Sequence, residues 1–203
     1  MNLRVATISD INDLTKISIE SFDPYNFVMG QLGEDYVREV FFPALLRDSN
    51  SYVVISESDG QVQAYAAGSL SYKNFSRTLR HGNLPRTAWY LLAGFLMRRV
   101  TFGDIYDVLR FDSNVVKTFS HLPSFGPYAV SPTIKGTPLA GIIARKTCIH
   151  VLDWMAAKGA VKCWATVDSR NTASQGLVEL LGFKKSQELV LSRRVEYLYW
   201  DEF

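Results

Sequence analysis

The sequence predicts an α/β protein in which short strands alternate with amphipathic helices. Three observations carry this prediction. Residues 51–57 and 61–70 are apolar runs joined by a turn containing Asp59-Gly60, and an Asp-Gly turn between apolar runs is a strong hairpin signal. Residues 128–157 have the pattern of a strand, a turn and a long helix. Residues 187–200 have the alternation of a closing pair of strands.

The composition is that of a folded globular protein. Hydrophobic residues make up 47% of the 203 residues and charged residues 21%, which excludes an intrinsically disordered chain. We expect one domain over residues 1–203, because the chain has no repeat, linker or low-complexity tract. A net charge of +2 gives no argument for a nucleic-acid partner. Without an apolar signal region or an uncharged run of about 18 residues, we expect a cytoplasmic protein with no membrane span.

The two cysteines, Cys148 and Cys163, indicate neither a disulfide framework nor a metal site. They are too few for such a framework, and they lack the spacing of zinc ligands. We therefore expect both to be small core residues, and we expect no bound metal.

The first part of the chain is predicted to begin with a strand and two helices. Residues 3–8 alternate in polarity as a strand does, and Ser9-Asp10 offers an N-cap to a helix that continues into Phe22. A second helix is predicted over residues 34–47, which Pro43 bends or interrupts.

Residues 72–120 follow the hairpin, and we expect this long segment to be mostly helical. The helices predicted in it cover residues 85–100, 104–109 and 114–118. The segment also holds six arginines, which suit an anionic partner or form a solvated face. The apolar side of the first of these helices is predicted to consist of Trp89, Leu92, Ala93, Leu96 and Met97.

The turn before the long helix is the candidate binding element. Thr137 is a plausible N-cap, Pro138 occupies the first helical position, and Lys158-Gly159 closes the helix. The N–H groups at such a helix start are unpaired and favour an anion in front of them. A phosphate-binding turn and a ligand-free strand–turn–helix unit are both consistent with this stretch alone. The apolar stripe of the helix is predicted to consist of Leu139, Ile142, Ile143, Ile149, Leu152, Met155 and Ala156.

This turn resembles the acetyl-CoA-binding motif of the GNAT N-acetyltransferases. The motif has a strand ending in Val, a Pro two residues later, a Gln or basic residue, and a small residue five positions further on. Here these are Val130, Pro132, Lys135 and Ala140. Pro138 stands where the family usually has its middle Gly, so one backbone donor to the pyrophosphate is absent.

A second motif strengthens the resemblance. A strand is predicted over residues 161–167 and a helix over 172–181, and the family commonly carries an Asn between these two elements and a Gly-Phe after the helix. Here these residues are Asn171 and Gly182-Phe183. The resemblance implies a mixed, mostly antiparallel central sheet flanked by helices, with residues 72–120 as a helical insertion between the third and fourth strands. The last two strands are predicted over residues 187–192 and 195–200.

The resemblance also implies an activity and a site. The chain would transfer an acetyl group from acetyl-CoA, used as co-substrate, to the amine of a small molecule such as an amino-sugar nucleotide. The cofactor would contact Tyr128, Val130, Lys135, Gly136, Thr137, Leu139, Ala140, Gly141 and Asn171. The acceptor would contact Tyr72, Arg77, Arg80, His81 and Ser124.

The usual acid and base of the family are absent. Val178 stands where many members have the Tyr that protonates the departing thiolate, and Ser124 stands where some have a Glu that acts as the general base. The candidate substitutes are His121, just before the predicted fourth strand, and Asp23 at the end of the first helical region.

Two other functions stay open from the sequence. The acceptor amine could belong to a peptide or an amino acid, or the chain could be a degenerate member that binds acyl-CoA without catalysis. The sequence is compatible with a monomer or a homodimer.

Overall fold

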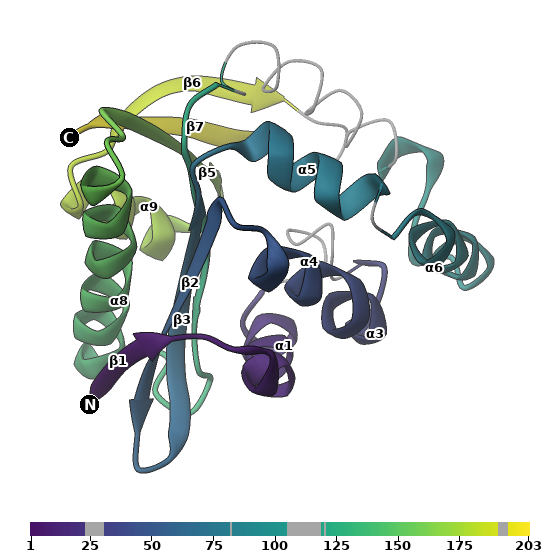
Figure 1. The fold of residues 1–203 in the computed structure, drawn as a ribbon, viewed down its shortest axis with the longest axis horizontal. Helices are drawn as coiled ribbons and strands as arrows, with labels where there is room; N and C mark the ends of the chain where they lie inside the picture. Colours follow the sequence, from purple (N-terminus) through teal and green to yellow (C-terminus); the bar gives the residue numbers. More distant parts are fainter. Residues whose placement is uncertain (23–30, 82, 105–118, 120, 191–194) are drawn as a thin grey trace.

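A single seven-stranded sheet with helices on both faces forms the frame of the protein (Figure 1). The computed structural model describes residues 1–22, 31–81, 83–104, 119, 121–190 and 195–203. The strand order is β1-β2-β3-β4-β5-β7-β6. All neighbouring strands are antiparallel except β4 and β5, which are parallel. The predicted mixed, mostly antiparallel sheet is thus confirmed.

The elements follow one another in the order that the sequence predicts, with additions. The strands are β1 (Asn2–Val5), β2 (Ser51–Ser58), β3 (Gln61–Ser69), β4 (Ser124–Val130), β5 (Lys162–Asp168), β6 (Lys184–Val190) and β7 (Val195–Glu202). The helices are η1 (Ile8–Asp10), α1 (Ile11–Ser21), α3 (Glu34–Tyr36), η2 (Val37–Phe41), α4 (Phe42–Arg47), α5 (Tyr72–His81), α6 (Leu84–Leu96), α8 (Pro138–Ala157) and α9 (Thr172–Leu180).

The β2–β3 hairpin turns where the sequence predicts. Ser58 pairs with Gln61 across a two-residue loop. Asp59 and Gly60 have φ angles of 54° and 73°, the left-handed values that match a tight hairpin turn to the twist of its strands.

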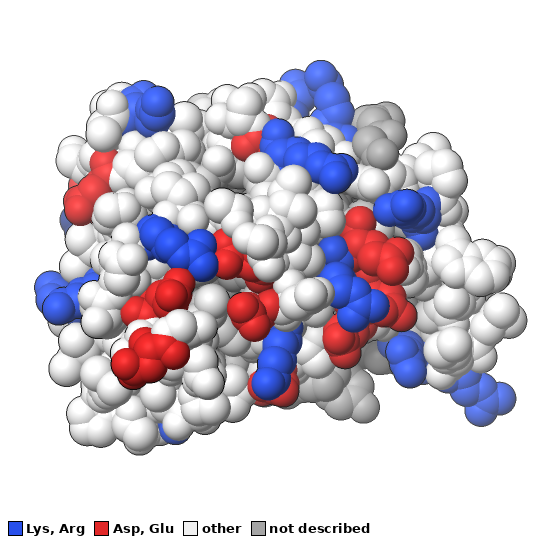
Figure 2. All heavy atoms as spheres, turned by 60° about the horizontal axis from the view of Figure 1, so that its bottom comes forward, with Lys and Arg blue, Asp and Glu red and all other residues white. Residues whose placement is uncertain are grey.

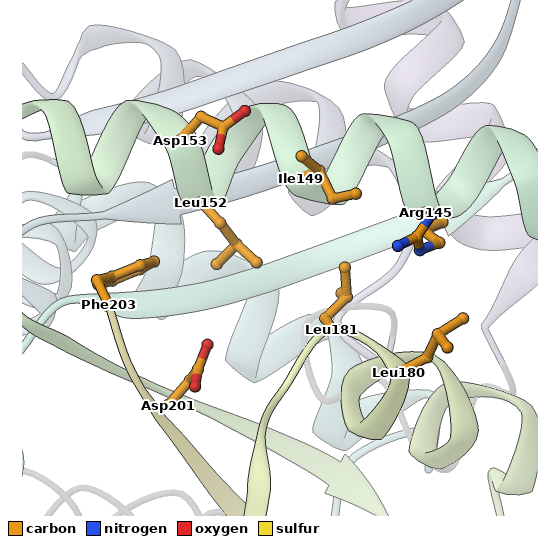
Figure 3. A pocket seen from close by; sticks show the side chains of 8 residues that line it. All are labelled: Arg145, Ile149, Leu152, Asp153, Leu180, Leu181, Asp201 and Phe203. Carbon is orange, nitrogen blue, oxygen red and sulfur yellow. The ribbon is translucent and has the colours of Figure 1, made fainter.

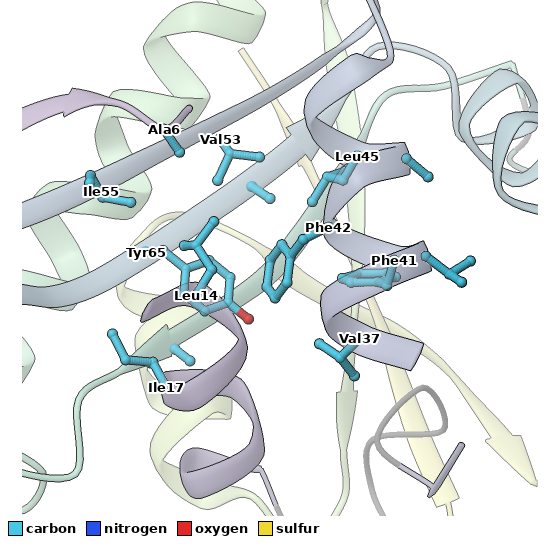
Figure 4. Close-up of a cluster of buried hydrophobic side chains, with 14 of the residues drawn as sticks. Ala6, Leu14, Ile17, Val37, Phe41, Phe42, Leu45, Val53, Ile55 and Tyr65 are labelled. Carbon is cyan, nitrogen blue, oxygen red and sulfur yellow. The ribbon is translucent and has the colours of Figure 1, made fainter. Parts of the chain in front are cut away.

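One face of the sheet packs against α1, η2 and α4 (Figure 4). Alternate residues of the central strands, such as Val53, Ile55 and Tyr65, point to this face, because successive side chains of a strand point to opposite sides. Phe42 of α4 meets the Tyr65 ring edge-on, with the ring centroids 5.6 Å apart. Burying a large apolar side chain stabilises the fold by about 1.5–3 kcal/mol, so this layer fixes the position of α1.

The other face packs directly against α8. Gly68 of β3 permits the close approach, because a Cβ there would lie 2.2 Å from Met155 Cε and 2.7 Å from Val151 Cγ1. Cys148 and Cys163 are both free and buried on this face, as predicted. The predicted stripe of α8 is wrong in part: Leu139, Ile142 and Ala156 are exposed, while Thr147, Cys148 and Val151 are buried.

The first strand ends at Val5, three residues earlier than predicted. Asp10 is the reason, since its carboxylate accepts hydrogen bonds from the Thr7 backbone N–H at 2.7 Å and from Arg4 at 2.8 and 2.9 Å. These bonds close a capping box and draw the chain into η1. Ser9 therefore does not cap the helix, and Asp10 is a buried ion-pair residue.

The helix predicted over residues 34–47 is present as three continuous parts. Residues Val37–Phe41 form a π-helical turn directly before Pro43. Proline has no N–H and its ring crowds the carbonyl four residues earlier, so the widened turn absorbs the interruption.

The described part of the insertion is mostly helical, as predicted; it includes α5, for which no separate helix was predicted, and α6. Helix α6 ends at Leu96 and not at Val100, because Arg98 has a left-handed φ of 56° and the chain folds back. The Gly94 carbonyl then accepts the N–H groups of Arg99 and Val100 at 2.8 and 3.2 Å. The predicted helices over 104–109 and 114–118 fall outside the described residues, except for Asp104.

Candidate functional site

The parallel strands β4 and β5 pair at only one position. Ser124 lies opposite Trp164, and the backbone N–H of Trp164 donates to the Pro123 carbonyl at 3.0 Å. On its other edge β5 pairs with β7 over its full length. The two strands therefore run together at their first residues and separate toward their carboxyl ends. We call the two facing edges that do not pair with each other, Tyr128–Val130 on β4 and Thr166–Asp168 on β5, the β4–β5 fork.

The backbone of β4 points polar groups into the fork. The Ser131 N–H donates to the Gln63 carbonyl at 2.7 Å, so Ser131 and Ala129 face β3. Because hydrogen-bonding directions alternate along a strand, the N–H and C=O groups of Tyr128 and Val130 face β5 instead.

The backbone of β5 does the same from the other side. The Ser169 N–H donates to the Val195 carbonyl at 2.8 Å, which directs Ser169 and Val167 toward β7 and Thr166 and Asp168 toward β4. The Asp168 carbonyl accepts Gln175 Nε2 at 3.2 Å. Backbone groups of Tyr128, Val130 and Thr166 thus line the fork, where they can pair with amides of an extended ligand.

A bulge in β4 turns Tyr128 toward α9. The β3–β4 register shifts between Ala66 and Gly68, so Phe125 and Tyr128 lie on the same face with their rings stacked 5.8 Å apart. The Tyr128 hydroxyl donates to the Ser174 carbonyl at 3.2 Å. Burial raises the pKa of Tyr128, so this hydroxyl keeps its proton at neutral pH and ties β4 to α9.

The turn after β4 presents free donors at the start of α8. The N–H groups of Lys135 and Thr137 donate to carbonyls within the turn. Thr137 caps the helix by accepting the Ala140 N–H on its hydroxyl at 3.3 Å. Within the described residues, the N–H groups of Gly136 and Leu139 have no partner, and a Cβ at Gly136 would meet no atom within 4 Å. Free donors, open space and the helix dipole suit an anion.

Lys135 and Ser21 join this turn to α1. Lys135 Nζ donates to the Ser21 carbonyl at 3.2 Å, at the C-terminal end of α1 where the helix dipole is negative. The Ser21 hydroxyl donates to the Val130 carbonyl at 2.6 Å. No signal in the sequence indicated this role for Ser21, because Ser21 and Val130 are 109 positions apart in the chain.

Asn171 caps α9, and Val178 packs its buried side. The Asn171 side-chain oxygen caps the helix by accepting the Ser174 N–H at 3.0 Å. Val178 is fully buried in the core, together with Phe125 and Phe183. Its side chain therefore packs and, having no polar atom, donates no proton.

Two of the acceptor candidates, Tyr72 and Ser124, lie at the paired end of β4 and β5. Tyr72 begins α5 and meets the Trp164 ring edge-on at 5.2 Å. Ser124 is buried opposite Trp164, and His121 is exposed in the turn before β4. Arg77 is exposed on α5. Asp23 and the side chains of Arg80 and His81 lie outside the described part of the chain.

Trp164 is a further residue at this end that the sequence did not single out. Its side chain is buried, and its indole N–H has no hydrogen-bond partner among the residues that the structure describes. A buried donor without a partner costs about 1–3 kcal/mol, so such a group suits contact with water or a ligand. Its adjacency to Tyr72 and Ser124 arises from strand pairing, which no local signal in the sequence reveals.

A pocket of about 230 Å³ lies elsewhere, between α8 and the ends of α9 and β7 (Figure 3). Arg145 lies near one end, with Asp153 and Asp201 on facing elements toward the other, and none of the predicted site residues lines it. Across the described residues, no helix has the length and apolarity to cross a membrane, and no cluster of His, Cys, Asp or Glu could hold a metal ion.

Comparison with known proteins places the fold. No protein-family model matches the sequence, and no curated protein matches it at a significant level. Solved structures match over the whole chain. An N-acetyltransferase from Staphylococcus aureus Mu50 superposes with a TM-score of 0.59 at 14% identity, covering 99% of this chain and 97% of that one.

Two further structures are similar to the same extent. A ribosomal-protein-alanine N-acetyltransferase from Brucella melitensis has a TM-score of 0.57 at 13% identity, with all of both chains covered (100% and 100%). The candidate acetyltransferase yncA from Salmonella typhimurium, solved with its cofactor acetyl-CoA, has a TM-score of 0.57 at 16% identity, covering 100% of this chain and 93% of that one. With its order of strands, its separated β4 and β5 and its helix-capped turn, the chain has the fold of the GNAT acetyltransferases.

Proposed function

We propose that the protein is an acetyl-CoA-dependent N-acetyltransferase that acetylates the amine of a small molecule. The observation that carries this proposal is the β4–β5 fork, where the two strands do not pair with each other and their edges lead to the free donors at the start of α8. A ligand with an extended arm that carries amide groups would fit the fork, and an anionic group at the end of that arm would fit the donors at the start of α8.

The residues present fit acetyl-CoA in two parts. The backbone groups of Tyr128 and Thr166 and the N–H of Val130 would pair with the amides of the pantetheine arm, since the Val130 carbonyl already accepts the Ser21 hydroxyl. The N–H groups of Gly136 and Leu139 would bind the pyrophosphate, with Lys135 adding a positive charge beside it. Leu139, Ala140, Gly141 and Asn171 complete the proposed cofactor contacts. Pro138 supplies no donor, so we expect a smaller number of hydrogen bonds to the pyrophosphate than the usual motif provides.

Acetyl-CoA supplies the acetyl thioester, and the chain positions it for attack by the acceptor amine. In the transfer, the bond between nitrogen and the carbonyl carbon forms and the bond between carbon and sulfur breaks. Positioning and polarisation of the carbonyl carry much of the rate, whereas acid–base assistance contributes about 10²–10⁴-fold. A thiol with a pKa of about 8.5 is a fair leaving group near neutral pH, so transfer does not require an acid in place of Val178. His121 and Asp23 remain the proposed proton acceptors.

The acceptor is proposed to bind around the paired end of the two strands. Tyr72 and Ser124 lie there; Arg77 and Arg80 of α5 would supply positive charge for an anionic acceptor such as an amino-sugar nucleotide, and His81 a further polar group. A peptide or amino-acid amine is the alternative acceptor, and one structural neighbour is a ribosomal-protein-alanine N-acetyltransferase.

A second candidate function is binding of acyl-CoA without catalysis. The observation that favours it is the full burial of Val178, which leaves no proton donor at the position of the family's Tyr. Pro138, which removes one donor to the pyrophosphate, points the same way.

Cofactor binding is tested by thermal unfolding with and without acetyl-CoA. A ligand that binds only the folded state raises the melting temperature, and a saturating concentration of about 100 Kd corresponds to about 2.7 kcal/mol. Gly141→Glu should abolish this shift, because Gly141 is exposed beside the turn and its Cβ would meet no protein atom. The variant itself should fold, since replacing a helical glycine does not destabilise a helix. Ala156→Glu, at the exposed far end of α8, adds the same charge and should keep the shift.

Turnover separates the two functions. Thiol release from acetyl-CoA is measured with a panel of amines that includes amino-sugar nucleotides, amino acids and peptides. We expect amine-dependent release, with preference for an anionic small amine. A normal thermal shift with no release for any amine would favour the binding protein, and absence of both would contradict the site itself.

A further inference from the structure

Helix α6 has the reverse of the polarity expected for a surface helix. Its inner side packs on the body: the Tyr90 ring meets Tyr36 edge-on at 5.7 Å, and the Tyr90 hydroxyl donates to Glu39 at 2.9 Å. Its outer side carries Trp89, Leu92 and Leu96 at helical spacing, and Trp89 is 66% and Leu96 78% exposed. A surface helix normally turns charged residues outward, so this side has the character of a buried face.

The exposed apolar side chains continue past the end of the helix. Phe102 is 79% exposed, and its ring lies 4.6 Å from that of Phe95. We call this group the α6 apolar surface, which consists of Leu84, Trp89, Leu92, Leu96, Met97 and Phe102. Grouped exposure of this kind marks an interaction site, whereas single exposed apolar residues are ordinary.

Positive charge is concentrated in the same part of the chain. Residues 72–104 hold six basic residues and one acidic residue, a net charge of +5, whereas the whole chain carries +2. Figure 2 shows the end of the molecule that holds α6 as largely uncharged, with Lys and Arg atoms at its border and the acidic atoms further inward.

The arginines nearest the surface form no ion pair with an acidic residue of the described part of the chain. Arg86, Arg98 and Arg99 are exposed, and among the described residues none of them takes part in an ion pair. The acidic residue Asp104 instead accepts hydrogen bonds from the N–H and hydroxyl of Thr101, at 2.7 and 2.6 Å.

We propose that α6 and the turn after it dock on an anionic lipid membrane, with the helix lying in the plane of the interface. A bilayer surface combines anionic headgroups, which match the exposed arginines, with an apolar interior that accepts Trp, Leu and Phe. The 13 residues of α6 measure about 20 Å. This is too short to span a hydrocarbon core of about 30 Å, but a helix of this length can lie flat in the membrane interface. A second copy of the chain matches the surface less well, because two net-positive segments repel each other.

The binding test is sedimentation of the full chain with vesicles. One set contains phosphatidylcholine alone and the other phosphatidylcholine mixed with phosphatidylglycerol. We expect binding to the mixed vesicles, weakening as salt rises, and at least about tenfold weaker binding to phosphatidylcholine alone. Equal binding to both sets, or binding to neither, would overturn the proposal.

Variants assign the binding to α6. Leu92→Glu with Leu96→Glu should reduce binding at least about tenfold, because a charged side chain resists insertion among lipid chains. Val161→Glu, which changes a residue 69% exposed at the start of β5, should leave binding unchanged. The acetyl-CoA thermal shift serves as the check that both proteins are folded. Loss of binding in the Val161→Glu protein as well would contradict the assignment.

Two readouts identify the contact more closely. Tryptophan fluorescence should shift to shorter wavelength with mixed vesicles, and Trp89→Phe should remove that shift, since Trp89 is the exposed tryptophan on the surface. Arg86→Gln with Arg99→Gln should reduce both the binding and its dependence on salt. Sedimentation velocity without lipid tests the competing partner, a second copy of the chain. If the protein is a dimer and the variant with Leu92→Glu and Leu96→Glu is a monomer, the α6 apolar surface is a dimer interface and the membrane proposal is wrong.

Discussion

Helices α8 and α6 have similar sequence signals and opposite surroundings. Each begins with a proline in its first turn, and a residue of positive φ follows each of them, Gly159 after α8 and Arg98 after α6. In α8 the side with Cys148, Val151 and Met155 is buried against the sheet, whereas in α6 the side with Trp89, Leu92 and Leu96 faces outward. Periodicity therefore identifies an apolar side of a helix but does not say what covers it.

The neighbours explain the difference. Helix α8 lies on β3 at Gly68, where the absence of a side chain lets Met155 and Val151 approach the strand. Among the described residues, helix α6 reaches the body through its other side, where the Tyr90 ring meets Tyr36 and a Cβ at Gly94 would lie 3.9 Å from Leu32 Cδ2. One helix is thus part of the core, and the other is attached to it.

The largest difference should appear on truncation of one apolar side chain in each helix. Met155→Ala should lower the free energy of unfolding by about 3 kcal/mol, because Met155 is fully buried and its removal leaves a cavity. Leu96→Ala should change it by less than about 0.5 kcal/mol, because Leu96 is 78% exposed. Urea unfolding of the two variants checks the pair. Comparable losses would mean that the outer side of α6 is covered in solution.

Charged residues also differ between the body of the protein and the insertion: near β1 they are paired, whereas Arg86 of the insertion has no described ion-pair partner. Arg4 binds Asp10 and Glu57 at 2.8 to 2.9 Å, and this pairing lowers the pKa of Asp10 from 3.8 to about 2. The folded-state pKa is depressed, so the stabilisation is complete above pH of about 4 and is lost as the pH falls toward 2. Asp10→Asn should lower the free energy of unfolding at pH 7 by about 2 kcal/mol and flatten its dependence on pH between 4 and 2.

Arg86→Gln is the matched control from the insertion. Arg86 is exposed and has no ion-pair partner among the residues that the structure describes, so its loss should not alter the acid limb of the stability curve. Chemical unfolding at a series of pH values measures both variants. An Asp10→Asn protein with unchanged acid sensitivity would show that other carboxylates govern acid unfolding.

The fold was predictable where local chemistry determines it. Asp59-Gly60 defines the hairpin turn, and Thr137, Pro138 and Gly159 bound α8 as predicted, because each acts on its own stretch of backbone. Helix α5 was missed, since only Phe75 and Leu79 give it an apolar side, although Ser71 caps its start by accepting the Asn74 N–H on its hydroxyl at 3.3 Å. Its place depends on a contact with the body, the Phe75 ring meeting Phe41 at 6.0 Å.

The candidate site divides along the same line. The turn and cap residues, Lys135 to Ala140, could be predicted because they are adjacent in the sequence. The fork could not be predicted from the residues themselves, since it depends on where β4 and β5 stop pairing. The contacts of Ser21 with Val130 and of Trp164 with Tyr72 likewise join distant parts of the chain, so only the assembled sheet reveals them.

The smallest expected difference concerns the first turn of each helix. Thr137 accepts the Ala140 N–H on its hydroxyl, whereas Asn83, at the N-cap of α6, makes no such side-chain bond. Thr137→Ala should therefore lower the free energy of unfolding by about 1 kcal/mol, and Asn83→Ala by less than about 0.5 kcal/mol. Thr137→Ala should also reduce the acetyl-CoA thermal shift, because the cap holds the Gly136 and Leu139 donors in place, while Asn83→Ala should not. Urea unfolding and thermal shifts of both variants test this. Equal costs in stability with an unchanged shift in both would show that the cap orders the helix without preparing a ligand site.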